Sequence, residues 1–86
     1  MDLVELPRLG LNFKVERRNI SGQSSQQRRL HCLDHPGLFV SNEARKCRRT
    51  QALLRGIPHG VVLERDSDGA LFVLLPASAK VFFVSL

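Results

Sequence analysis

Residues 60–86, GVVLERDSDGALFVLLPASAKVFFVSL, contain three apolar runs that are separated by two short turn-like segments. Short runs rich in Val, Leu and Phe that are bounded by Gly, Pro, Asp and Ser are typical of β-strands. The middle run, ALFVLL (70–75), does not alternate between apolar and polar residues, so we expect a central strand buried on both faces. Gly69 in the segment DSDG favours a hairpin between the first two of these strands.

The segment before these strands, NEARKCRRTQALLR (42–55), has the start and stop signals of a helix. Ser41 or Asn42 can cap its first turn, and Gly56 stands where a left-handed residue often ends a helix. The apolar positions form a narrow stripe that includes Cys47, so we expect this thiol to be buried. The pattern predicts one helix lying on a sheet.

Upstream, residues 9–16 (LGLNFKVE) alternate between apolar and polar side chains, which indicates a half-buried strand. An earlier strand is expected near 3–6, two short strands at 29–33 and 37–41, and a loop at 18–28. Together the elements predict an α+β fold: an antiparallel sheet of about five strands with one helix, 42–55, packed on one face.

The chain has 86 residues, which is the size of a single small domain spanning 1–86. It ends on apolar residues inside the last expected strand, 80–86. We therefore predict that the chain is a fragment of a larger protein and that this strand forms an open apolar edge prone to association. No secretory signal opens the chain, so a cytoplasmic location with two free thiols is expected.

The apolar tail 70–86 is the single candidate for a membrane segment. Its 17 residues are few for a bilayer span, and Pro76 and Lys80 interrupt it. We expect buried strands here and no membrane partner.

Several residue groups resemble catalytic or metal sites, but their spacing argues against each one. His31, Cys32 and His35 are close in sequence, yet His31 and Cys32 are adjacent and point to opposite faces of a strand. Cys47 has no base at hydrogen-bonding spacing. Asp66 and Asp68 lack the distal Glu of a calcium loop.

We therefore predict no metal, no cofactor and no catalytic residue, so that the chain is not an enzyme. His31 and His35 are expected to flank a surface turn, with Cys32 or Leu33 turned inward.

The net charge is +5, and residues 42–55 carry +4 of it. Five cations on one helix can neutralise phosphates, which makes a small basic nucleic-acid-binding module one predicted function. No aromatic residue is interleaved with these charges, so base stacking is not expected and binding should be weak. Charge on a helix is more often a solvated face, so nucleic-acid binding is the alternative to a structural or protein-interaction role. The candidate polyanion-binding residues are Arg45, Lys46, Arg48, Arg49 and Arg55.

Three segments, ELPRLGLNF (5–13), HPGLFVSN (35–42) and LLRGIPHGVVLERDSDGALFVLLP (53–76), carry a resemblance to a known family. Together they resemble a segment of very large eukaryotic proteins, commonly fungal and protist, that contain paired domains of unknown function sometimes named ubiquitin-hydrolase-like. The resemblance implies a scaffold: a non-catalytic structural or protein-interaction segment of a large protein. Its partner would be the rest of a parent chain or another protein. The ubiquitin label does not transfer, because the segment has no Cys/His/Asp constellation.

Overall fold

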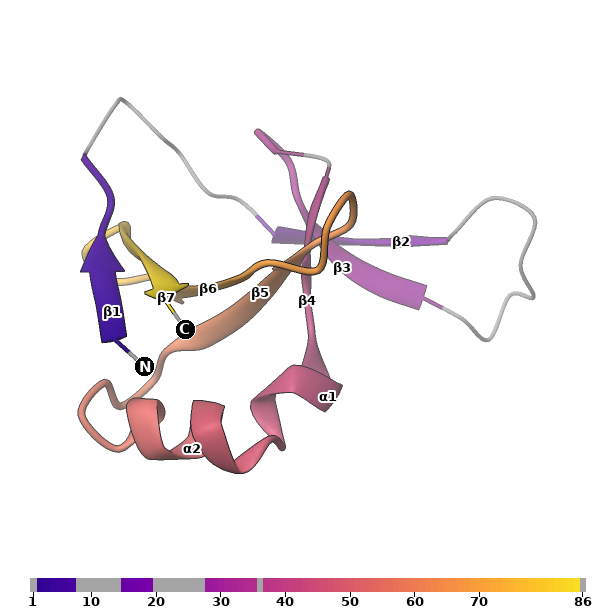
Figure 1. Ribbon diagram of the computed structural model, residues 1–86. Helices are drawn as coiled ribbons and strands as arrows, with labels where there is room; N and C mark the ends of the chain where they lie inside the picture. Colours follow the sequence, from indigo (N-terminus) through magenta and orange to yellow (C-terminus); the bar gives the residue numbers. More distant parts are fainter. Residues whose placement is uncertain (1, 8–14, 20–27, 36, 86) are drawn as a thin grey trace.

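The computed structural model describes residues 2–7, 15–19, 28–35 and 37–85. Within these residues the backbone forms one antiparallel sheet of seven strands, in the order β1-β7-β6-β5-β4-β3-β2, and two short helices (Figure 1). The α+β class predicted from the sequence is confirmed. The elements are β1 (Asp2–Glu5), β2 (Val15–Asn19), β3 (Arg28–Cys32), β4 (Leu38–Val40), α1 (Asn42–Arg45), α2 (Arg48–Leu54), β5 (Val61–Arg65), β6 (Leu71–Leu75) and β7 (Lys80–Ser85).

The described sheet has seven strands, more than the five or so expected. The loop predicted at 18–28 is wrong at both ends, since Arg18 and Asn19 belong to β2 and Arg28 begins β3. Most of the strand predicted at 9–16 lies outside the described residues. The sequence of β2, VERRN, has a single apolar residue, and the strand is defined by its backbone ladder with β3 rather than by an apolar pattern.

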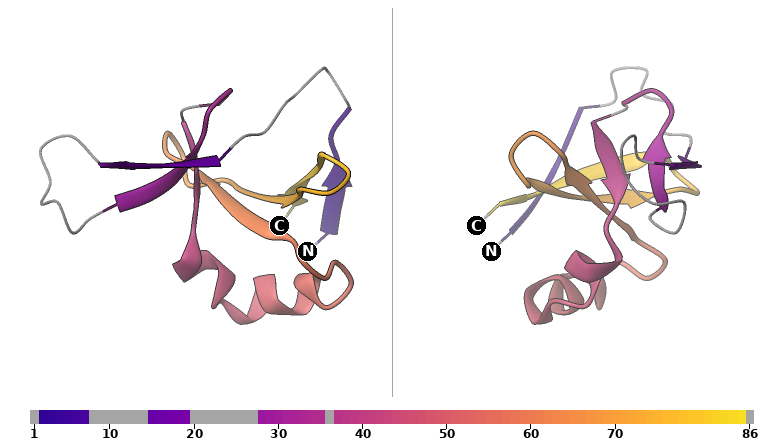
Figure 2. Two further views of the ribbon diagram at one scale, coloured as in Figure 1. Left: turned by 180° about the vertical axis from the view of Figure 1, so that it is seen from behind. Right: turned by 90° about the vertical axis from the view of Figure 1, so that its right-hand side faces the viewer.

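The sheet buries apolar side chains on both of its faces. On one face Cys32 from β3 belongs to the same core cluster as Val81 from β7, although three strands separate β3 from β7 in the sheet. The sheet therefore curls around this core, as both views in Figure 2 indicate. The cluster also contains Leu63, Phe72 and Leu74.

The other face of the sheet is covered by the helices. Val73 lies on this face, and its neighbour across Gly60 is Leu54 of α2. Phe72, Val73 and Leu74 are only 7%, 0% and 1% exposed, which confirms that the ALFVLL run is buried on both faces.

The helix predicted at 42–55 is divided in two. Lys46 ends α1, and Cys47 has an extended backbone (φ −65°, ψ 138°) before α2 begins at Arg48. The break separates Arg45 from Arg48 and Arg49, which in a continuous helix would lie three and four residues away on one face.

The chain leaves α2 through a series of tight turns rather than through a left-handed cap at Gly56. The amide of Gly56 donates to Leu53 (3.2 Å) and that of Ile57 to Leu54 (3.1 Å). The left-handed residue comes later, at His59, with φ of 67°.

The last strand is not an open edge. β7 pairs with β6 on one side and with β1 on the other, from Asp2 opposite Ser85 to Glu5 opposite Phe82. The expected bare apolar strand at 80–86 is therefore wrong for the described residues, because the N-terminal strand covers it.

Gly60 lies where the end of the helical segment meets the sheet, and it has no room for a side chain. A Cβ atom there would be 2.9 Å from both Leu54 Cδ2 and Val73 Cγ1. We expect Gly60→Ala to lower the free energy of unfolding by about 1–3 kcal/mol, as overpacking does. Gly56→Ala is the matched control, because its nearest contact would be an ordinary 3.7 Å. Equal urea midpoints for the two variants would contradict this packing.

Candidate functional site

Ser41 fixes the start of the basic segment on the sheet. Its amide donates to the Val62 carbonyl (3.0 Å), and its hydroxyl donates to Glu64 Oε1 (3.1 Å). The same hydroxyl accepts the amide of Ala44 (3.2 Å), so Ser41 is the N-cap of α1, as the sequence predicted for Ser41 or Asn42. Because Ser41 is only 7% exposed, α1 has a defined position over β5.

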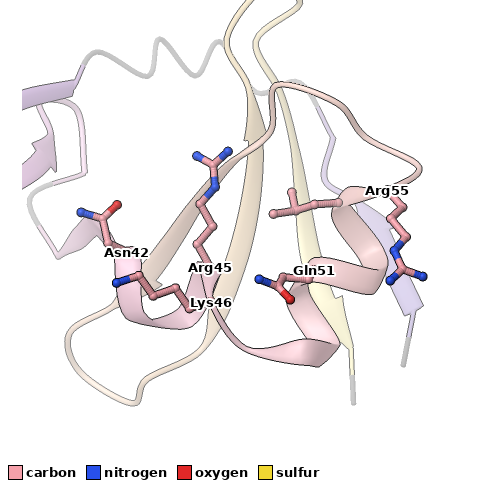
Figure 3. Close-up of a pocket in the computed structure, with 6 residues that line it drawn as sticks. Asn42, Arg45, Lys46, Gln51 and Arg55 are labelled. Carbon is pink, nitrogen blue, oxygen red and sulfur yellow. The ribbon is translucent and has the colours of Figure 1, made fainter.

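The break between α1 and α2 creates an open, shallow pocket of about 680 Å³ (Figure 3). One side is formed by α1 with Lys46, and the other by the second half of α2 with Arg55. A straight helix would distribute the same residues around its axis instead. The pocket is lined by Asn42, Arg45, Lys46, Gln51, Leu54 and Arg55.

The structure brings together three of the five predicted polyanion-binding residues. Arg45, Lys46 and Arg55 line the pocket, whereas Arg48 and Arg49 lie exposed on the first turn of α2 outside its lining. Within the described residues, none of the five forms an ion pair; the carboxylate partners there belong to Arg65 and Lys80. The cluster is therefore available to an external anion.

Sequence reasoning did not identify the two amides of the pocket, Asn42 and Gln51. Both are exposed and lie among the cations. An amide donates and accepts hydrogen bonds, whereas Arg and Lys only donate, so the pocket suits an oxyanion that also carries hydroxyl groups. Gln51 could have been recognised as a candidate from the sequence, because it is a polar residue that interrupts the apolar stripe of the predicted helix.

The sequence-based placement of Cys47 is wrong, because this residue is exposed at the N-cap of α2. Its side chain makes no capping hydrogen bond. The backbone N–H groups of Arg49 and Thr50 nevertheless favour the thiolate, and they lower the pKa of Cys47, with a smaller contribution from the Arg49 charge. The helix break, which was not expected, is the reason that this thiol faces solvent.

Cys32 behaves in the opposite way. It is fully buried in the core, and burial, assisted by the charge of Asp34, raises the pKa of its thiol to about 11. Leu33 is 42% exposed, so of the two candidates for the inward position it is Cys32 that turns inward.

We expect Cys47 to react with iodoacetamide in the folded protein at least about 100-fold faster than Cys32, because the thiolate is the reactive species. Mass spectrometry of the digested protein after timed labelling at neutral pH gives both rates. In 6 M urea, where the fold no longer separates them, the two rates should become similar. Equal rates in the folded protein would contradict the burial difference.

The histidines and the carboxylates do not assemble into a metal centre in the described part of the chain. No three His, Cys, Asp or Glu residues there lie close enough to hold an ion. His31 and His35 are half-buried rather than on the open surface as expected, and the His31 ring lies 6.4 Å from that of Phe39.

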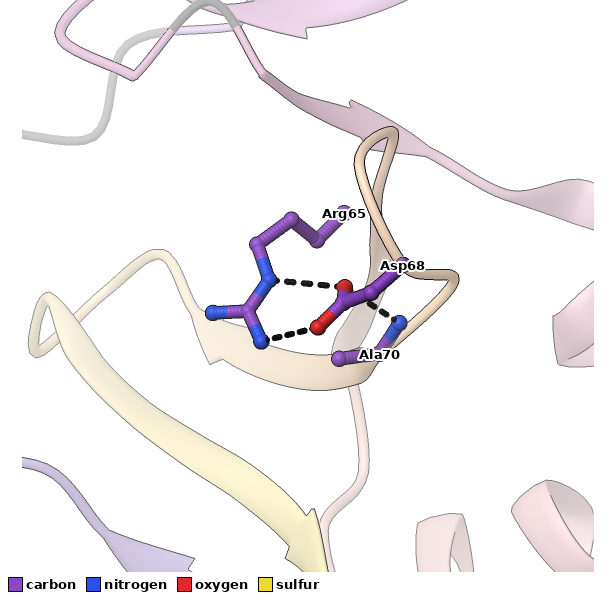
Figure 4. Close-up of polar contacts among 3 residues, drawn as sticks. All are labelled: Arg65, Asp68 and Ala70. Atoms are coloured by element: carbon purple, nitrogen blue, oxygen red, sulfur yellow. Dashed lines mark hydrogen bonds and ion pairs between the residues drawn. The ribbon is translucent and has the colours of Figure 1, made fainter.

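The carboxylate of Asp68 stabilises the β5–β6 turn by accepting hydrogen bonds within it (Figure 4). Arg65 Nε donates to Asp68 Oδ1 (2.8 Å), Arg65 Nη2 donates to Oδ2, and the Ala70 amide also donates to Oδ1 (3.1 Å). The Arg65 hydrogen bonds, followed by that of Ala70, lower the pKa of Asp68 to about 2. Asp66 and Asp68 are exposed, so this loop is the solvated hairpin turn that the sequence predicted.

A second, smaller pocket of about 330 Å³ lies beside this turn, lined mainly by the apolar side chains of Leu71, Phe83 and Val84. Its charged residue is Asp68, whose carboxylate is already bound to Arg65. The basic pocket between α1 and α2 is therefore the stronger candidate for a functional site.

In the part of the chain that the structure describes, neither helix has the length and hydropathy needed to cross a bilayer. In comparisons with known proteins, the chain matches no protein-family profile, no curated protein and no solved structure. The resemblance to very large eukaryotic proteins therefore stays a prediction.

Proposed function

We propose that this chain is a non-catalytic interaction module that binds the phosphate backbone of nucleic acids through residues 42–55. One observation carries the proposal: five exposed cations gather on two short helices, three of them around one open pocket, without carboxylate partners among the described residues. Such a cluster is self-repelling, and a polyanion relieves the repulsion.

The chemistry of the pocket favours phosphate as the ligand. The guanidinium groups of Arg45 and Arg55 can each donate two parallel hydrogen bonds to phosphate oxygens, and Lys46 adds a point charge. Neutralising phosphates also releases condensed counterions, which drives the association at low salt.

Base recognition is not part of the proposal. Phe39 and Phe72 are buried, and Phe82 and Phe83 are half-buried, so these aromatic rings offer no open stacking platform. Binding through phosphates alone carries little sequence information. We therefore expect similar affinities for duplexes of unrelated sequence.

If the chain is instead the protein-interaction segment predicted from the sequence, its binding to nucleic acid should differ in strength and in salt dependence. A scaffold whose basic helices are merely solvated should bind nucleic acid weakly and release it near physiological salt. The two functions are thus separated by salt dependence.

Fluorescence anisotropy of a labelled DNA duplex, titrated with the protein from about 50 to 400 mM salt, tests the proposal. The expected log–log slope of the binding constant against salt is about −3 or steeper, with measurable binding at about 150 mM. The five cations of 42–55 account for slopes down to about −4.5. No binding at that salt concentration would favour the protein-interaction segment.

A further inference from the structure

The two amide side chains of the pocket are not used by the fold. Asn42 is the first residue of α1, but Ser41 supplies the cap of that helix. Gln51 takes part in hydrogen bonds only through its backbone, which donates to Cys47 and accepts from Arg55. Both side chains are exposed, and among the described residues neither amide group forms a hydrogen bond. Both amides are therefore available to a ligand.

Each wall of the pocket presents one amide one helical turn away from one cation. The pair is Asn42 and Lys46 on α1, and it is Gln51 and Arg55 on α2. Residues at this spacing lie on the same helix face, with about 5–6 Å between their Cβ atoms. Figure 3 shows the Gln51 amide pointing from α2 toward α1. The break between the helices thus places two amide–cation pairs around one open space.

Amides and cations recognise different groups of a nucleic acid. Arg and Lys side chains only donate hydrogen bonds, so they suit the oxygens of a phosphate. An amide oxygen needs a donor, and the 2′-hydroxyl of a ribose both donates and accepts. DNA has no such hydroxyl. An amide that lies next to a phosphate-binding cation therefore suits a nucleotide with a hydroxyl beside its phosphate, which is a ribonucleotide.

We infer that the pocket binds duplex RNA in preference to DNA, with the two amides hydrogen-bonded to ribose 2′-hydroxyls while Arg45, Lys46 and Arg55 hold the phosphates. This inference rests on the proposed function. The wide, shallow minor groove of A-form RNA displays 2′-hydroxyls, and proteins recognise it through these groups and the phosphates rather than through base sequence. An open, shallow pocket on helices that lie outside the sheet can reach such a groove (Figure 1).

Single-stranded RNA fits the pocket less well than a duplex does. Proteins recognise unpaired bases by stacking them on aromatic or guanidinium planes and by reading their edges. No phenylalanine lines the pocket, and Phe39 and Phe72 are buried in the sheet. The apolar lining residue is Leu54, which has no flat face for a base.

The test compares three duplexes of one sequence: RNA, DNA, and RNA whose 2′-hydroxyls are replaced by fluorine. The fluorinated duplex keeps the A-form and the phosphates but offers no hydroxyl. Fluorescence anisotropy at about 150 mM salt gives the three affinities. The amide variant is Asn42→Ala/Gln51→Ala, and alanine favours both helices. The control is Ser67→Ala, which removes an exposed polar group outside the pocket.

We expect the wild type to bind RNA about tenfold more tightly than either DNA or the fluorinated duplex, because two neutral hydrogen bonds contribute about threefold each. In the amide variant the affinity for RNA should fall about tenfold, and the preference for RNA should disappear. Ser67→Ala should keep the wild-type preference. Thermal melts followed by circular dichroism check that both variants fold.

Equal wild-type affinities for the three duplexes would overturn the inference while leaving the proposed function intact. If RNA and the fluorinated duplex bound equally well and DNA bound less tightly, the preference would come from the A-form shape, and the role of the hydroxyls would be refuted. An amide variant that kept the preference would refute the assignment of Asn42 and Gln51. Because the fluorinated duplex is tested on the wild type, the inference can fail even if the amide variant does not fold. If the wild type bound none of the duplexes, the proposed function itself would fail.

Discussion

Replacing Leu63 by alanine is expected to lower the free energy of unfolding by about 2–5 kcal/mol. Leu63 is completely buried in the core around which the sheet curls, and its register partners are Val40 on β4 and Phe72 on β6. The loss combines the transfer free energy of the deleted carbon atoms with the cavity that they leave. A domain of this size has about 4–13 kcal/mol of stability in total, so the effect is a large fraction of it.

Urea unfolding followed by circular dichroism measures this loss. Leu33→Ala is the control, because Leu33 is 42% exposed and its truncation should change stability by no more than about 0.5 kcal/mol. Similar effects of the two substitutions would mean that the curled core does not exist as described.

Neutralising the pocket with Arg45→Gln/Arg55→Gln is expected to weaken the binding of a DNA duplex about 30-fold at 150 mM salt. The two residues contribute about 1.8 to the log–log salt slope, and this difference sets the loss of affinity at that concentration. Both side chains are exposed and make no ion pair among the described residues, so the fold should be unchanged.

The control for net charge is Arg65→Gln/Lys80→Gln, which removes the same two charges from positions outside the pocket. It should cost no more than about threefold in affinity, since Arg65 is already bound to Asp68 and Lys80 to Glu5. If both double variants lost affinity equally, binding would depend on overall charge, and the pocket would have no special role.

The strands of the C-terminal half could be predicted because their apolar runs are unbroken. The run at 70–75 has apolar residues on both faces of the strand, which predicts burial on both sides. Phe72, Val73 and Leu74 are buried as predicted. The sequence of β2 gave no such signal, because an edge strand rich in arginine is paired through its backbone. Its partner strand had to be placed before β2 could be recognised.

The candidate site could be predicted in its residues but not in its geometry. The five cations of 42–55 are evident from composition. Which of them face one another depends on the break at Lys46 and Cys47, and no Gly or Pro in the sequence marks that break. The same break exposes Cys47.

Chemical-shift mapping of the ¹⁵N-labelled protein during titration with a short DNA duplex tests whether residues 42–55 bind nucleic acid phosphates. We expect the largest and most salt-sensitive amide shifts in 42–55, including Asn42, Gln51 and Arg55 around the pocket. Shifts confined to β1, β6 and β7, or no shifts at a duplex excess under low salt, would contradict it.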